Sequence, residues 1–258
     1  MRKTKELVIE KSLLSSALIT IAVTIGIVLV LAIEAVQFFS EVSILDFLTD
    51  TQWTPLFTDK HYGILPLLSG TLLTSFIAIS VALPIGLSIS IYLSEYAPKS
   101  FRKTVKPLLE LLAAVPTVVY GFFALIVVTP FLQQIIPGLS GFNSLSAGFV
   151  MGIMIIPYIS SISEDALHAV PNALREASFG MGATKLQTAF KVVVPAASSG
   201  IIVSIILAIS RAIGETMIVA VAAGQQPRLT LDPTVPVETI TAYIVQVSLG
   251  DVEHGSVE

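Results

Sequence analysis

The longest intervals without a charged residue constrain the fold of this chain more than any other feature of its sequence. No Asp, Glu, Lys or Arg lies from Tyr62 to Ser94, and none lies from Leu111 to Ser163. A helix needs about 20 mostly apolar residues to cross the hydrocarbon core of a bilayer. With 12% charged residues and a mean hydropathy of +0.87, the chain lacks the polar surface that a water-soluble globule of its size requires. The sequence therefore predicts an all-α, polytopic membrane protein.

Five membrane-spanning helices fit these intervals, at about residues 13–33, 65–93, 112–132, 145–162 and 197–222. The apolar stretch of the first helix is too long for a cleavable signal core, so we expect a retained signal anchor. The interval from Leu111 to Ser163 is too long for one crossing, and a polar segment with Gly and Pro at 133–143 divides it into two helices. Residues 1–258 are expected to form a single membrane domain.

The basic residues are distributed unequally between the two sides of the predicted membrane. Most of the 14 Lys and Arg precede the first helix, or lie between the second and third or the fourth and fifth helices. Cytoplasmic loops are enriched in Lys and Arg, so the N-terminus and the loop at 168–195 are predicted to be cytoplasmic. The tail at 223–258 is then external. Its apolar segment Ile240–Leu249 is too short to cross and indicates a re-entrant or interfacial piece, or the start of a further helix.

The 168–195 loop has the pattern of two short helices joined by a glycine turn. Asn172 to Phe179 are mostly good helix formers, and Gly180 and Gly182 follow them. Thr184 and Gln187 have the spacing of a capping box, which opens a second helix. Such a hairpin is too small for a core of its own, and its position between two spans suits docking into a groove of another protein. A solvated linker is the alternative.

Seven residues of this loop carry a resemblance to a known family. They are Glu176, Ala177, Ser178, Gly182, Val192, Val194 and Pro195. In type and spacing they resemble the EAA loop of ABC importer permeases, with Ser178 in place of the second Ala and with Val192 and Val194 in place of Ile and Leu. The resemblance implies a coupling helix that sits in a cleft of a cytoplasmic ATPase.

Three further stretches narrow the resemblance to the permeases of phosphate importers, and to their C subunit more than their A subunit. They are 114–121 (AVPTVVYG), 172–178 (NALREAS) and 210–217 (SRAIGETM). The resemblance implies a type I ABC importer permease fold in the cytoplasmic (inner) membrane, and implies that the final, sixth helix is missing from this chain. The implied partners are a cytoplasmic ABC ATPase dimer, a second homologous permease and an external phosphate-binding protein that docks on 34–60, 133–143 and the tail. ATP and Mg²⁺ would bind the ATPase, and no cofactor would bind this chain.

Two charged residues fall inside the fifth predicted helix. Arg211 is costly at that depth and needs a partner or a wet cavity, and Glu215 lies four residues later on the same face. One interpretation is an ion pair that fixes the rotation of the helix. The other is a translocation path in which Arg211 attracts an oxyanion and Glu215 controls its availability, while Gly214 allows close approach or local unwinding. Glu164 and Asp165, at the end of the fourth helix, are interpreted as a solvated interfacial pair.

Other function classes find no support in the sequence. The chain has no Gly-x-x-x-x-Gly-Lys-Ser/Thr loop for ATP, no His-Glu-x-x-His zinc helix, no paired intramembrane aspartates and no cysteine. We therefore expect no catalytic residue and no metal site. The basic residues form no face with interleaved aromatics, which argues against a nucleic-acid partner. A stand-alone carrier should show two inverted halves, and none is visible. Phosphate rests on the resemblance, and sulfate, molybdate and phosphonate are the alternative solutes.

Overall fold

The structure is a computed structural model that describes residues 2–248, and this part of the chain is helical without any strand. The long elements are α1 (Arg2–Glu41), α3 (Leu65–Ile91), α4 (Lys99–Ala113), α7 (Ser144–His168) and α11 (Ser198–Ile213). The short ones are α2 (Ile44–Thr49), α5 (Thr117–Phe123), α6 (Thr129–Ile135), α8 (Asn172–Gly180), α9 (Lys185–Thr188), α10 (Val194–Ala196), α12 (Met217–Ala222) and α13 (Ile240–Gln246). Three π-helical turns join some of them: η1 (Tyr92–Tyr96), η2 (Ala124–Val128) and η3 (Ala189–Val193).

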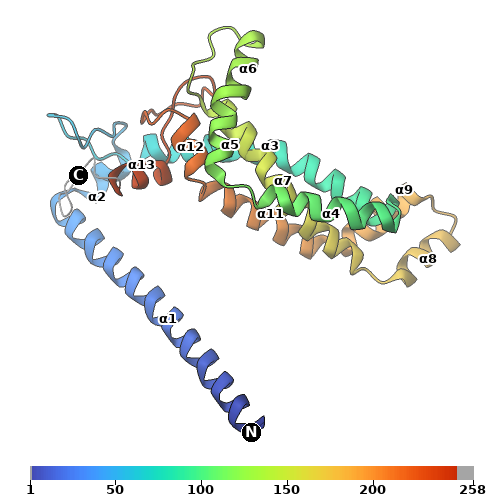
Figure 1. Cartoon of the computed structure of the whole chain (residues 1–258). Helices are drawn as coiled ribbons and strands as arrows, with labels where there is room; N and C mark the ends of the chain where they lie inside the picture. Colours follow the sequence, from blue (N-terminus) through green and yellow to red (C-terminus); the bar gives the residue numbers. More distant parts are fainter. Residues whose placement is uncertain (1, 249–258) are drawn as a thin grey trace.

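Helices α3, α4, α7 and α11 run side by side and form the bundle (Figure 1). One end of the bundle carries α8 and α9, and we call it the α8 end. The opposite end carries α12 and α13, and we call it the α13 end. Helix α1 leaves the α13 end and extends away from the bundle. None of the residues in its most apolar segment is buried. Its side chains are therefore left for lipid or for another chain to cover.

The predicted number of spans agrees with the helices that are long and apolar enough to cross a membrane. Four such segments are Ile9–Glu41, Leu65–Tyr96, Thr117–Ile135 and Ser144–His168, and a fifth arises if Lys185–Ala196 and Ser198–Ile213, bent by 72°, count as one span. The predicted break at 133–143 is confirmed, since α6 ends at Ile135 and α7 begins at Ser144.

Two predicted span boundaries are wrong. The third span is predicted to begin at residue 112, but α4 continues to Ala113 and the next helix begins only at Thr117, with Pro116 as its N-cap. The fifth span is predicted as one helix over 197–222. Instead α11 ends at Ile213 and α12 begins at Met217.

Each π-helical turn ends two residues before a proline: Pro98 after η1, Pro130 after η2 and Pro195 after η3. Proline lacks an N–H, and its ring displaces the carbonyl four residues earlier. In each case the residue just before the proline donates its N–H to the carbonyl five residues back, as Val194 does to Ala189. The proline positions therefore explain where the wider turns form.

The core of the bundle is the close contact between α3 and α7. A Cβ added at Gly148 would lie 2.8 Å from the Cβ of Ile77, and one at Gly152 would lie 2.8 Å from the carbonyl oxygen of Ala78. Small residues let the two backbones approach this closely, which maximises van der Waals contact where no hydrophobic effect drives helices together. Buried Ser163 and Ser204 join their hydroxyls at 2.7 Å and link α7 to α11.

Candidate functional site

The 168–195 loop forms the predicted helical hairpin. Helix α8 and helix α9 are joined by a turn in which Gly182 has a φ of +84°, in the left-handed region that suits glycine. The capping box is confirmed: Thr184 Oγ1 accepts from Gln187 N at 3.3 Å, and Thr184 N donates to Gln187 Oε1 at 2.9 Å. Ser178 Oγ meets Thr188 Oγ1 at 2.9 Å, so this side chain fastens the two helices together.

The hairpin presents an apolar surface to its surroundings. Glu176 and Ala177 are exposed, and α8 has no buried residue. The large exposed apolar side chains of the hairpin are Leu174, Phe179, Met181, Leu186 and Phe190. Val192, Val194 and Pro195 lie instead at its root, where buried Val193 packs with Leu167 and Val170 against the bundle. The outer surface of the hairpin is thus free to bind a partner, and its root is fixed to the spans.

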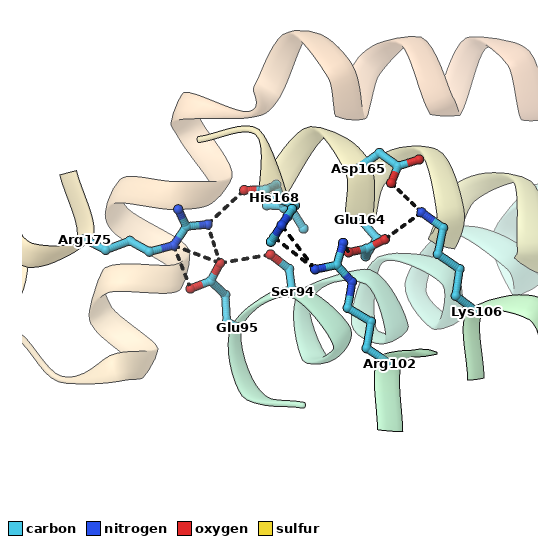
Figure 2. A network of polar contacts seen from close by, with 9 residues as sticks. Ser94, Glu95, Arg102, Lys106, Glu164, Asp165, His168 and Arg175 are labelled. Carbon is cyan, nitrogen blue, oxygen red and sulfur yellow. Dashed lines mark hydrogen bonds and ion pairs between the residues drawn. The ribbon is translucent and has the colours of Figure 1, made fainter. Parts of the chain in front are cut away.

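A network of ion pairs surrounds the root of the hairpin (Figure 2). Arg175 of α8 pairs with Glu95 of η1 at 2.8 Å, from Nη2 to Oε1. Arg102 and Lys106 of α4 both pair with Glu164 of α7, with a Lys106 Nζ to Glu164 Oε2 distance of 3.1 Å. Two pairs of elements that are distant in the sequence, α8 with η1 and α4 with α7, are tied together in this way.

The network corrects the interpretation of Glu164 and Asp165 as a solvated pair. The side chain of Glu164 is 1% exposed and is held by two cations, whereas Asp165 is largely exposed and contacts Lys106. Burial alone would lower the pKa of Lys106, but hydrogen bonds to Asp165 and Glu164 outweigh it and the pKa is raised. Arg102 and Lys106 are four residues apart on one helix face, but this local pattern does not indicate which distant carboxylate they contact.

Arg211 and Glu215 lie at the break between α11 and α12. Arg211 Nη1 is 2.5 Å from Glu215 Oε2, and their side chains are 30% and 1% exposed. Glu215 Oε1 accepts from the backbone N–H of Met217 at 3.2 Å and of Ile218 at 3.3 Å, so the carboxylate also caps α12. Helix α11 ends one residue before Gly214, and Arg211 Nη2 reaches the Met154 sulfur at 3.7 Å.

The predicted tail folds back onto this break. Thr241 Oγ1 donates to the Glu215 carbonyl at 2.7 Å, and Ile240 N donates to Thr71 Oγ1 of α3 at 3.1 Å. The apolar segment predicted at Ile240–Leu249 forms α13 over Ile240–Gln246. Residues 249–258 of the predicted tail lie outside the described residues.

The α13 end gathers the three segments that were predicted to bind an external protein. Ser140 N donates to the Thr234 carbonyl at 3.0 Å, which joins 133–143 to the tail, and the Trp53 and Tyr243 rings meet at 5.1 Å. A cavity of about 490 Å³ opens between the tail and the segment around Trp53. It is lined by Glu238, which is 2% exposed, and whose Oε1 finds no hydrogen-bond partner among the described residues. Burial raises the pKa of Glu238 from 4.5 to about 7.

No group of three or more His, Asp or Glu residues that could hold a metal ion occurs in the described part of the chain. The two predicted sites are both present as local structures but lie apart. The 168–195 loop is at the α8 end, while Arg211, Gly214 and Glu215 lie where α11 meets α12, toward the α13 end.

The chain is similar to a known protein family and to several named proteins. The family model described as "Binding-protein-dependent transport system inner membrane component" matches residues 82–245. "Probable ABC transporter permease protein YqgH" of Bacillus subtilis is 37% identical over 94% of this chain and 79% of its own length. "Phosphate transport system permease protein PstC" is 37% identical in Mesorhizobium japonicum, over 77% of this chain and 66% of that protein. The protein of this name in Haemophilus influenzae is 36% identical, over 76% of this chain and 69% of that protein. A chain of the MetNI methionine ABC transporter shows 24% identity and a TM-score of 0.45, over 59% of this chain and 68% of that chain.

Proposed function

The chain belongs to the family of binding-protein-dependent transport system inner membrane components, and from this premise we propose that it is the membrane-spanning permease subunit of an ATP-driven ABC importer. We propose inorganic phosphate as its solute, because relatives at 36–37% identity are named phosphate transport system permeases. The family match over residues 82–245 carries the proposal, since it includes both the 168–195 loop and the Arg211–Glu215 break.

The 168–195 loop is the proposed docking site for the ATPase. Its exposed apolar side chains, among them Phe179 and Met181, need a partner surface to cover them, and exposed Glu176 offers a charge that fixes the register. ATP and Mg²⁺ would be bound by a dimer of these ATPase subunits. The permease would then catalyse no covalent chemistry and would hold no cofactor.

Arg211 is the proposed solute contact on the translocation path. Its guanidinium keeps partial exposure while Glu215 holds one side of it, which leaves donors of this planar group for two oxygens of an oxyanion. Glu215 also caps α12, so a shift of α12 would change how firmly Arg211 is held. ATP binding would close the ATPase dimer, and the 168–195 loop would carry that motion into the spans as alternating access.

The remaining assignments follow the same proposal. The chain would form one membrane domain in the cytoplasmic membrane, with the α8 end and the N-terminus in the cytoplasm. A second homologous permease would complete the pathway. The external phosphate-binding protein would dock at the α13 end, where segments 34–60, 133–143 and the tail come together.

Reconstitution of the native complex tests the proposed function. The tagged chain is purified from its own membrane with the proteins that remain bound, and the complex is placed in liposomes with the external binding protein. We expect ATP-dependent uptake of radioactive phosphate, with sulfate and molybdate as competitors. Uptake of another oxyanion in place of phosphate would overturn the solute. A chain that purifies alone and transports without ATP would overturn the importer assignment.

Arg211→Gln tests the path in the same liposomes. We expect assembly to be retained and phosphate uptake to be lost, because the glutamine amide cannot supply the charge or the planar fork of donors. Lys103→Gln is the control, since Lys103 is an exposed cation of α4 that lies outside the proposed path and the proposed docking surfaces. Normal transport by Arg211→Gln would show that Arg211 serves only to pair with Glu215.

A further inference from the structure

Arg175 connects α8 to two spans through a single guanidinium group (Figure 2). Its Nη2 donates to Glu95 Oε1 at 2.8 Å, and its Nε lies 3.3 Å from both oxygens of Glu95. Its Nη1 donates to the Val170 carbonyl at 2.6 Å, and Nη2 also donates to the Leu167 carbonyl at 2.8 Å. Three parts of the chain therefore converge on one side chain: α8, the end of the α3–η1 span and the last turn of α7.

The contact is enclosed and geometrically demanding. The side chains of Arg175 and Glu95 are 14% and 11% exposed, and Ser94 Oγ donates to Glu95 Oε1 at 3.0 Å. Exposed ion pairs are screened and contribute little, but a part-buried pair with two-point geometry holds its partners in one arrangement. The Leu167 carbonyl belongs to the last turn of α7, and the Val170 carbonyl follows two residues after the helix ends.

The rest of α8 is not held in this way. None of its residues is buried, and Ser178 ties it to Thr188 within the same hairpin. The apolar contacts of Val170 and Val193 fix the root of the hairpin to the bundle but do not include α8. The polar contacts described between α8 and the ends of α3 and α7 are those of Arg175.

We propose that Arg175 is a positioning residue for energy coupling, which makes α8 and the adjoining ends of α3 and α7 move as one body. This inference rests on the proposed function, in which a partner ATPase displaces the hairpin. A displacement of α8 acts on Arg175, which directly precedes the exposed Glu176, and passes to Glu95 and to the last turn of α7. Without this link, α8 pivots about its root and the motion of the partner is lost before it reaches the spans.

The chemistry requires arginine at this position. A lysine keeps the charge, but its single ammonium lacks the fork of donors that contacts the two carboxylate oxygens and the two carbonyls together. Arg175→Lys is therefore expected to show a weaker form of the defect of Arg175→Gln. Glu95→Gln removes the charge from the other partner and keeps its size.

The first test compares ATP hydrolysis with phosphate uptake in reconstituted complexes. We expect Arg175→Gln and Glu95→Gln to retain the bound ATPase and its hydrolysis, while phosphate transported per ATP falls about tenfold. The amount of phosphate that Arg175→Lys transports per ATP should lie between the values of these variants and that of the wild type. Arg102→Gln is the matched control, because Arg102 forms a comparable ion pair with Glu164 at the same end without contacting α8. It should lower thermal stability and leave the transport ratio unchanged.

The second test measures the link directly and requires no transport. The chain contains no cysteine, so spin labels can be placed on Gly180→Cys in α8 and Ser88→Cys in α3. Position 180 leaves open space for a side chain, and Ser88 is exposed. In the otherwise unaltered complex, the distribution of distances between the two labels should be narrow both with and without ATP and vanadate. In the Arg175→Gln variant, this distribution of distances should broaden when the nucleotide is added.

Each outcome decides the proposal. A wild-type transport ratio in Arg175→Gln and Glu95→Gln, or an unchanged label distance, overturns it. Loss of the ATPase from both variants also overturns it, since Arg175 would then shape the docking surface. If Arg175→Gln does not fold, the transport ratio of Glu95→Gln alone tests the proposal. Failure of the wild-type complex to transport phosphate with ATP contradicts the proposed function, whereas the label distances still report on Arg175.

Discussion

Gly182 and Gly180 are two glycines of one hairpin with different reasons to be there. Gly182 has a φ of +84° and no atom within 4 Å of an added Cβ, whereas Gly180 has equal space and ends α8 without a positive φ. Conformation, and not crowding, therefore selects glycine at position 182. Side chains with a β-branch are strained most in the left-handed region.

Gly182→Val should uncouple transport from ATP hydrolysis, because the strained turn re-aims α8 relative to α9. Gly182→Asn should retain more coupling, since asparagine tolerates the left-handed region. Gly180→Val serves as the control in the same hairpin and should leave the ratio of phosphate uptake to ATP hydrolysis close to that of the wild type. Full coupling in Gly182→Val would contradict the role of the turn.

Glu238 makes the stability of the protein depend on pH. Its pKa rises from 4.5 to about 7 in the folded protein because the side chain is buried. Between these values the folded state binds more protons than the unfolded state, so the free energy of unfolding falls as the pH rises across that window.

Glu238→Gln should therefore raise the thermal unfolding midpoint at pH 8 and change it little at pH 5. The measurement is thermal unfolding of the detergent-solubilised chain at both pH values. Asp46→Asn, at an exposed carboxylate of α2, should leave the difference between the two pH values unchanged. An equal shift at pH 5 and pH 8 in Glu238→Gln would mean that packing, and not ionisation, is affected.

Helices α3 and α7 form the element pair on which the bundle depends. Gly148 and Gly152 are one turn apart on α7 and both face α3 at distances that leave no room for a Cβ. Their spacing is the small-xxx-small pattern of helix contacts in membranes. The ion pairs of Glu164 and the Ser163–Ser204 hydrogen bond lie further along the same helix. Helix α7 thus contacts α3, α4 and α11 along its length.

Gly152→Leu should destabilise this pair by about 1–3 kcal/mol, because the added atoms force α3 and α7 apart. Gly26→Leu is the control, since Gly26 is also helical but an added Cβ meets nothing within 4 Å. Unfolding midpoints in detergent should fall for Gly152→Leu and stay near the wild type for Gly26→Leu. Equal midpoints for the two variants would contradict the close packing.

At the scale of the whole molecule, two functional ends are joined by the same few helices. The hairpin at the α8 end is rooted on α7 and α11, and α11 leads directly to Arg211 and the break before α12. The tail then pins that break to α3 through Thr241 and Ile240. Movement of the root of α11 therefore has a short path to the proposed solute contact, through covalent chain and buried contacts.

Structural features that depend only on residues close together in the chain could be predicted from the sequence. Charge-free intervals located the spans, because only apolar residues are stable in hydrocarbon, and the Thr184–Gln187 capping box and the turn at Gly182 depend on residues within one or two turns. The Arg211–Glu215 pairing was accessible for the same reason, since residues four apart share a helix face.

The ion pairs between distant helix ends could be determined only from the tertiary structure. Glu95 and Arg175 are separated by 80 residues, and Glu164 meets Arg102 and Lys106 across about 60. Nothing in the local pattern selects these partners, so the sequence alone predicts that a carboxylate near the end of a span is solvated. The break of the fifth span at Gly214 likewise needs the tail, which supplies Thr241 to a carbonyl that a continuous helix would have satisfied itself. Local propensity fixed the elements, and packing chose the partners of their charges, because a buried charge is stable only beside another group that satisfies it.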